Sequence, residues 1–189
     1  MGCQMDEISY NRGTMDMDEI IEKAEEVAQE YNPQTLSPFP YENILDSKKD
    51  LQIYLATMDM EISGAIGWNT KDKKFEIFVN KEKPQNRQNF TLAHELGHYF
   101  LHQEIIQKED ALIDSEDILD SNTTLFRNDV VSSSEIEKEA NNFAASLLMP
   151  SDLVKKVWNA FKNVEECAKL FQVSVVAMSI RLERLGLVT

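Results

Sequence analysis

The sequence predicts an α+β fold, in which a small antiparallel or mixed β-sheet packs on two helices and a helical appendage follows. Three observations predict it. Apolar and polar residues partly alternate over residues 50–68 and again over 74–80, which is the two-residue period of strands. Apolar residues recur at helical spacing over 84–103 and 132–149. Short helical patterns then continue from Pro150 to the end of the chain.

The first segment, residues 1–40, is expected to be a helical unit. Apolar side chains recur at helical spacing over residues 16–31, with acidic residues between them. Three prolines in NPQTLSPFPYEN then end this pattern. We therefore divide the chain into an N-terminal helical segment, 1–40, a central domain, 41–150, and a C-terminal helical segment, 151–189.

The central domain begins with three predicted strands, near 51–57, 62–68 and 74–80. A charged turn at 71–74 separates the last two strands, so we expect them to pair in antiparallel fashion. The edge of a sheet can hold a peptide in extended form, and strands 62–68 and 74–80 are the candidates for such an edge.

A polar, acidic stretch without a clear period covers residues 104–134. It predicts a long loop with a short helix near 114–120. Two interpretations of this insertion stay open: a lid or specificity loop over a site, or a surface loop without such a role.

The chain is acidic, with 33 acidic and 19 basic residues and a net charge of -14. Non-specific nucleic-acid binding needs a cationic surface, so nucleic acid is not an expected partner. No apolar run reaches the length of a membrane span, and the N-terminus lacks the pattern of a signal peptide. We therefore expect a soluble cytoplasmic protein with no membrane partner, whose cysteines, Cys3 and Cys167, are free thiols.

All histidines of the chain lie within TLAHELGHYFLH, at positions 94, 98 and 102. On a helix, His94 and His98 share a face and can direct two imidazole nitrogens to one point, as zinc requires. Glu95 lies beside this pair, where it can reach a water bound to the metal and act as general base. Gly97 removes bulk between the ligands, where a strand or substrate could approach. His102 is given no role.

Zinc needs a third protein ligand, and the metzincin pattern would need glycine at 101 and histidine at 104, which this chain lacks. A carboxylate from the helix over 132–149 is the best source. Glu137 lies nearest the apolar stripe of that helix, while Glu135 and Glu139 suit a solvated first turn. Asn141, one turn after Glu137, can accept a ring N–H from a ligating histidine.

FTLAHELGHYFLH at 90–102 and EKEANNFAASLLMP at 137–150 together resemble the ImmA/IrrE family of metallopeptidases. The resemblance implies that His94, His98 and Glu137 are zinc ligands and that Glu95 is the catalytic base. It also implies that 41–150 is a zincin-like metallopeptidase domain of gluzincin type. Members of this family typically act in cytoplasmic regulatory proteolysis and cleave a helix-turn-helix repressor encoded nearby, on a mobile genetic element, prophage or stress operon. Manganese or iron would also suit two histidines and a carboxylate.

The C-terminal segment resembles a helix-turn-helix, with two short helices joined near residues 172–174. DNA binding and docking of a repressor are both open functions for it. The second helix offers only Arg181 and Arg184 for contacts with DNA, fewer than base readout normally uses. We therefore favour helical packing or partner docking.

Two functions from different classes follow. The first is a zinc-dependent endopeptidase of regulatory role, acting on a helix-turn-helix repressor. The alternative is a metal-binding sensor, or a DNA- or repressor-binding module, without hydrolysis. The intact motif with Glu95 favours the first, because a purely structural metal site has no need of a base.

Overall fold

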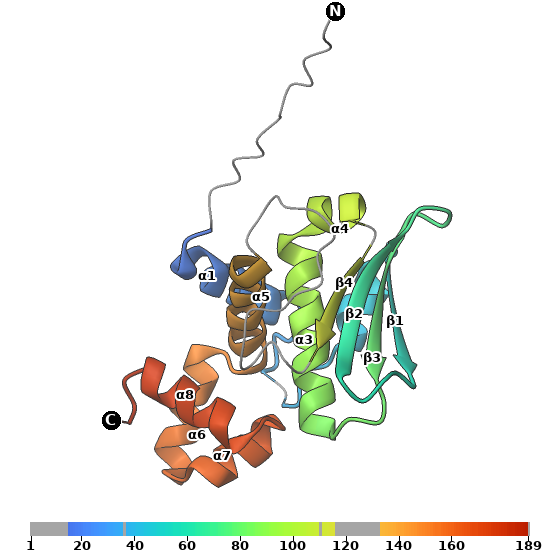
Figure 1. Cartoon of the computed structure of the whole chain (residues 1–189). Coiled ribbons are helices and arrows are strands. Elements are labelled where there is room, and N and C mark those ends of the chain that lie inside the picture. The colour runs from blue at the N-terminus through green and yellow to red at the C-terminus, as the bar shows by residue number, and fades with distance from the viewer. Residues whose placement is uncertain (1–14, 36, 110, 116–132, 189) are drawn as a thin grey trace, which may run out of the picture.

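The computed structural model describes residues 15–35, 37–109, 111–115 and 133–188 of the chain (Figure 1). Its elements, in chain order, are α1 (Met17–Tyr31), α2 (Glu42–Ser47), β1 (Leu51–Ala56), β2 (Ile62–Asn69), β3 (Lys74–Asn80), α3 (Gln85–Leu101), α4 (Gln103–Glu109), β4 (Ala111–Ser115), α5 (Ser133–Leu148), α6 (Ser151–Phe161), α7 (Val164–Phe171) and α8 (Val175–Arg184).

The strands form one mixed four-stranded sheet in the order β1-β3-β2-β4. As predicted, β2 and β3 form an antiparallel pair, with Ile66 opposite Ile77. Strand β1 pairs with β3 in parallel, and β4 pairs with β2 in antiparallel fashion. Helices pack on this sheet and further helices follow it, so the predicted α+β class is confirmed.

The prediction of a loop over 104–134 is wrong for its first third. Helix α4 occupies residues 103–109, and β4 follows at 111–115. Residues 116–132 lie outside the described residues, and with them most of the helix expected near 114–120. A strand as short as β4 has little pattern of its own. Strand β4 forms because the edge of β2 that faces away from β3 carries backbone N–H and C=O groups that need hydrogen-bonding partners.

The candidate peptide-binding edge was also misplaced. Strands β2 and β3 are both interior strands, since β3 lies between β1 and β2, and β2 lies between β3 and β4. Among the described strands, β1 and β4 are the edges. Strand order depends on pairing between segments distant in the sequence, which the alternation of residues within one strand does not specify.

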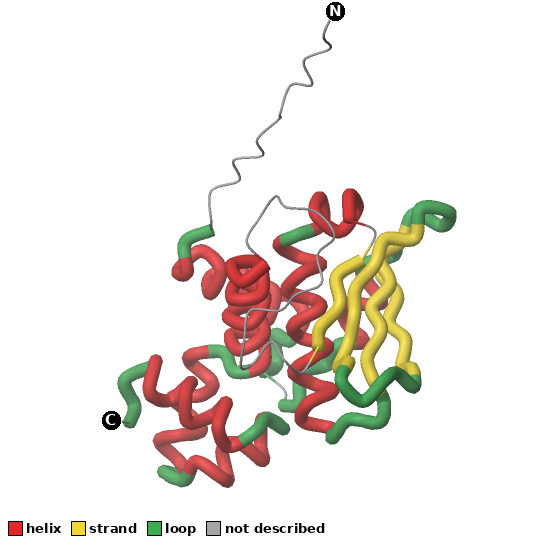
Figure 2. Tube along the Cα trace, viewed as in Figure 1, coloured by secondary structure: helices red, strands yellow, loops and turns green. Residues whose placement is uncertain are grey.

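Helix α3 lies between the sheet and helix α5. Figures 1 and 2 show the sheet on one side of α3 and α5 on the other, with α1 behind α5. Helices α3 and α5 approach closely at Gly97, where an added Cβ would lie 3.1 Å from both Cα and O of Ala140. The neighbour that requires Gly97 is therefore helix α5, and not the strand or substrate expected from the sequence.

The short helical patterns predicted after Pro150 are the helices α6, α7 and α8, and α7 and α8 are joined by residues 172–174, as predicted. Asn163 caps α7 by accepting a hydrogen bond from the Glu166 backbone, and Ser174 caps α8 in the same way from Ala177. Gly186, with a φ of +66°, follows the last helix and lets the chain turn there, because glycine enters the left-handed region without strain. The division of the chain at residues 40 and 150 stays a prediction.

Cys167 is buried, while Cys3 lies outside the described residues, so the expectation of two free thiols stays a prediction. No helix in the described part of the chain is long and apolar enough to cross a membrane.

Candidate metal centre

Two helices bring the predicted ligands together. His94 and His98 lie one turn apart on α3, and Glu137 lies on the facing side of α5. Their ligand atoms all lie within 4.8 Å of one another, and all three residues are buried. The close approach of α3 and α5 at Gly97 and Ala140 makes this possible, since Gly97 directly precedes His98. The structure thus assembles the three residues that the sequence selected.

The side-chain distances describe a compact donor cluster. The Nε2 atoms of His94 and His98 are 3.0 Å apart. Glu137 Oε2 lies 3.1 Å from His94 Nε2, and Glu137 Oε1 lies 3.5 Å from His98 Nε2. Burial by itself raises the pKa of the Glu137 carboxyl, but when His94 and His98 are protonated, their hydrogen bonds and charge outweigh burial and hold that pKa well below its usual range. Glu137 is therefore an anion at neutral pH, as a metal ligand must be.

Hydrogen bonds from behind the cluster select the histidine tautomers. His94 Nδ1 lies 3.0 Å from Asn141 Oδ1, the contact predicted from the sequence. Because a carbonyl oxygen only accepts, Nδ1 carries the proton, and in the neutral imidazole, the form that binds a metal, Nε2 keeps its lone pair. His98 Nδ1 lies 3.0 Å from His102 Nδ1, and His102 Nε2 lies 2.9 Å from Glu139 Oε2. The Glu139 carboxylate accepts from His102 Nε2–H, so His102 Nδ1 accepts from His98.

This proton arrangement provides a test of whether a metal fits. It leaves the lone pairs of His94 Nε2 and His98 Nε2 facing one another at 3.0 Å, next to the carboxylate of Glu137. Two lone pairs and an anion at such distances repel one another unless a cation lies among them. Two imidazole nitrogens and one carboxylate are also a donor set that zinc accepts. The residues therefore fit a metal ion.

Glu95 follows His94 and lies on the sheet side of α3. The side chain is 1% exposed and approaches β2 at Gly64, where an added Cβ would lie 3.1 Å from Glu95 Oε1 and 2.4 Å from Thr91 Cγ2. Glycine at 64 is thus needed for α3 to lie this close to β2. The packing holds the Glu95 carboxylate beside the ligand pair and outside the three-residue cluster.

Sequence reasoning missed two residues of the site. His102, given no role, contacts a predicted ligand, and Glu139, expected to be solvated, has a side chain that is 13% exposed and bonds to His102. The expectation for Glu135 holds, because that residue is exposed. The signal available in the sequence was the spacing of His102, four residues after His98. No signal pointed to Glu139, because its role depends on where α5 crosses α3.

Comparisons with known proteins agree with this picture. A protein-family model described as the IrrE N-terminal-like domain, Peptidase M78, matches residues 48–183. A solved structure of a Mycobacterium tuberculosis transcriptional regulator resembles the fold with a TM-score of 0.55 at 12% identity. The match covers 87% of this chain and 46% of the regulator, so the chain spans less than half of that protein. At this identity the likeness concerns the fold alone. No curated protein matches the chain.

Proposed function

The chain belongs to the family of the IrrE N-terminal-like domain, Peptidase M78, and from this premise we propose that it is a zinc-dependent endopeptidase. The observation that carries the proposal is the buried cluster of His94, His98 and Glu137, with buried Glu95 directly after His94 on α3. A metal site needed only for stability would not require a buried carboxylate beside its ligands, since such a carboxylate costs desolvation. Peptide hydrolysis does require it.

Each residue has a distinct role in the proposed reaction. His94, His98 and Glu137 would hold zinc, which supplies Lewis-acid activation of a water molecule and of the scissile carbonyl. The Glu95 carboxylate takes a proton from the attacking water and delivers it to the nitrogen of the leaving amine. Asn141 and His102 keep the Nδ1 protons of the two histidines in place, so that both Nε2 lone pairs would be available to bind zinc.

The substrate would lie in extended form along the sheet. Strand β4 pairs with β2, the strand that approaches Glu95, and β4 is an edge of the sheet formed by the described strands. A peptide that adds to β4 would satisfy the backbone groups of that edge and bring a peptide bond toward Glu95. This placement replaces the edge expected from strands β2 and β3.

We further propose that the substrate is a helix-turn-helix transcriptional repressor and that the cleavage is regulatory and cytoplasmic. The C-terminal helices support a docking function better than DNA binding. Arg181 Nε donates to Met149 O at 3.0 Å, and Arg184 Nη1 donates to Asn142 Oδ1 at 2.6 Å. Arg181 is buried and engaged within the protein, which leaves Arg184 as the one basic residue of α8 for a contact with DNA.

The test is co-incubation of the purified, zinc-loaded protein with the helix-turn-helix repressor encoded nearest its gene. Glu95→Gln is the matched control, because it keeps the shape and removes the base. Products are read by intact mass, and bound zinc is measured in both proteins. We expect the repressor to be cut by the wild type and loss of Glu95 to slow this cleavage by about 100-fold or more. Equal cleavage by both proteins would refute the role of Glu95. If the repressor is bound but left whole by both, the non-hydrolytic alternative is supported instead.

A further inference from the structure

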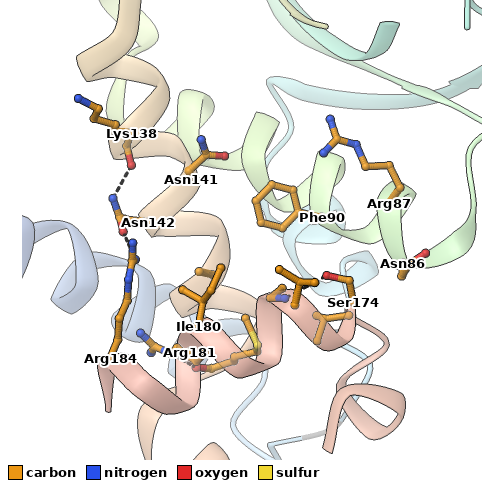
Figure 3. Close-up of a pocket in the computed structure, with 15 residues that line it drawn as sticks. Asn86, Arg87, Phe90, Lys138, Asn141, Asn142, Ser174, Ile180, Arg181 and Arg184 are labelled. Carbon is orange, nitrogen blue, oxygen red and sulfur yellow. Dashed lines mark hydrogen bonds between the residues drawn. The ribbon is translucent and has the colours of Figure 1, made fainter. Parts of the chain in front are cut away.

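A cavity of about 520 Å³ lies between helices α3, α5 and α8 (Figure 3). We call it the α8 groove. Its apolar lining comes from all three helices and comprises Phe90, Ala145, Met149, Val176, Ala177 and Ile180, among others. Figure 3 shows Phe90 of α3 and Ile180 of α8 on opposite sides of the space. A cavity of this size accepts several large side chains, such as those along one face of a helix.

The α8 groove borders the metal centre. Asn141 lines the groove and its Oδ1 lies 3.0 Å from His94 Nδ1. Phe90 also lines the groove, and its ring centroid is 6.4 Å from that of His94. A segment seated in the groove would therefore lie one side chain away from the proposed zinc ligands.

Helix α8 presents an apolar stripe to this groove that the fold itself does not use. Its core-facing residues, Met178 and Leu182, are fully buried. Val176 and Ile180 also lie one turn apart but on a different face, and they are 68% and 46% exposed. Exposed apolar residues that gather at a concave site, next to a proposed reaction centre, indicate a binding surface.

The charges around the groove select the partner. Arg87, Lys138 and Arg184 line it, and no lining residue in the described part of the chain is acidic. In Figure 3, Lys138, Asn142 and Arg184 follow one another along one side of the groove. Arg184 donates to the Asn142 amide, which is neutral and does not compensate the charge of the guanidinium. In a protein with a net charge of -14, such a cationic rim favours an acidic partner.

Arg181 also lines the groove but belongs to the fold. It is 5% exposed, and its guanidinium bonds to Met149 O and lies 3.5 Å from Glu25 Oε1. The positive charge for a partner therefore comes from Lys138 and Arg184.

We propose that the α8 groove docks an amphipathic helical segment of the protein substrate, with an apolar stripe flanked by aspartate or glutamate. The stripe covers Val176, Ile180 and Phe90, and the carboxylates meet Lys138 and Arg184. Apolar anchors at i, i+3, i+4 and i+7 are how helices enter such grooves. This proposal rests on the proposed function, because the docked segment is part of the chain to be cut.

The test measures binding apart from cleavage. The probe is a fluorescein-labelled helical peptide of about 14 residues, with leucines at i, i+3, i+4 and i+7 and glutamates beside them. A twin peptide carries lysines in place of the glutamates. Affinity is measured by fluorescence anisotropy on the full chain with Glu95→Gln, loaded with zinc, so that no peptide is cut.

The variants are Val176→Asp and Lys138→Glu, and the matched control is Val175→Asp. Val175 is 45% exposed on the same turn of α8 but does not line the groove. An aspartate in the first turn of a helix is favourable, so both valine variants should fold. We expect each groove variant to bind the glutamate probe with an affinity about tenfold or more lower than the parent protein, and the control Val175→Asp to bind it with unchanged affinity.

Several outcomes would overturn the proposal. These are no binding of the probe to the parent protein, equal binding of the lysine twin, or equal loss in Val175→Asp and Val176→Asp. A concentration-dependent dimer in sedimentation that Val176→Asp abolishes would assign the groove to a second copy of this chain instead.

The proposed function is tested separately from the docking site. Cleavage of the repressor without probe binding would support the peptidase function and refute the docking site. Specific probe binding without cleavage would support the docking site and refute the peptidase function.

Discussion

His98 and His102 face one another through their Nδ1 atoms, which are 3.0 Å apart on successive turns of α3. Only one of these nitrogens can carry the proton between them. Glu139 settles which, because its carboxylate accepts from His102 Nε2–H at 2.9 Å and makes His102 Nδ1 the acceptor. The backbone N–H of Met15 in turn donates to Glu139 Oε1 at 3.2 Å. A hydrogen-bonded chain thus runs from the start of the described structure to a predicted zinc ligand.

This series of hydrogen bonds predicts that the residues behind His98 contribute to metal affinity. His102→Ala or Glu139→Gln should weaken zinc binding by about 10–100-fold, because His98 loses the partner that fixes its tautomer. Competition with a chromogenic chelator measures the affinity directly. Glu135→Gln on the same helix is the control, since that residue is exposed and outside the chain of contacts. Unchanged affinity in both variants would show that His102 and Glu139 serve packing alone.

Removal of metal is expected to destabilise the protein. Without a cation, the Nε2 lone pairs of His94 and His98 and the carboxylate of Glu137 repel one another in a buried place. Free zinc at about 1,000 times its Kd should add about 4 kcal/mol to the free energy of unfolding. Thermal unfolding with EDTA, and again after zinc is restored, measures the effect. His94→Ala should abolish the difference, and a difference that persists in this variant would place the stabilising metal elsewhere.

Gly97→Ala should destabilise the protein although alanine is the better helix former. The new Cβ would lie 3.1 Å from backbone atoms of Ala140, which cannot rotate away, so α3 and α5 must separate. Such overpacking costs about 1–3 kcal/mol and exceeds the gain of about 1 kcal/mol in helix propensity. Denaturant titration checks stability. Zinc affinity should fall as well, because the separation moves Glu137 from the histidines. A variant as stable as the parent would mean that the two helices adjust freely.

Cys167 should react slowly with alkylating agents. Burial raises the pKa of its thiol, so the neutral form predominates at pH 7–8 and the nucleophilic thiolate is scarce. In a Cys3→Ser background, iodoacetamide should label the folded protein on the order of 100-fold more slowly than the urea-unfolded chain. Because the pKa of Cys167 is higher in the folded than in the unfolded protein, its ionisation also makes the free energy of unfolding depend on pH. The contribution of the neutral buried thiol to stability is fully present below the unfolded pKa of about 8.5 and is lost as pH rises above that value. Equal labelling rates in the two states would contradict the burial.

Local pattern was sufficient for much of the fold and of the site. The periods of 2 and 3.6 residues in the sequence predicted β1, β2, β3 and the long helices, because those segments are long and strongly patterned. The same helical geometry placed His94 and His98 on one face and selected Glu137 and Asn141 one turn apart on α5. These inferences need only the geometry of one element at a time.

The sequence by itself thus determined which elements form and which residue types could hold a metal. Tertiary structure alone decided the order of strands, the addition of β4 to β2, the crossing of α3 and α5 at Gly97, and the contact of Glu139 with His102. It also decided that Val176 and Ile180 of α8 line a groove beside the metal centre. The physical reason is that each of these features is a contact between segments distant along the chain. Such a contact depends on the position and direction of two elements at once, which the period of neither one contains.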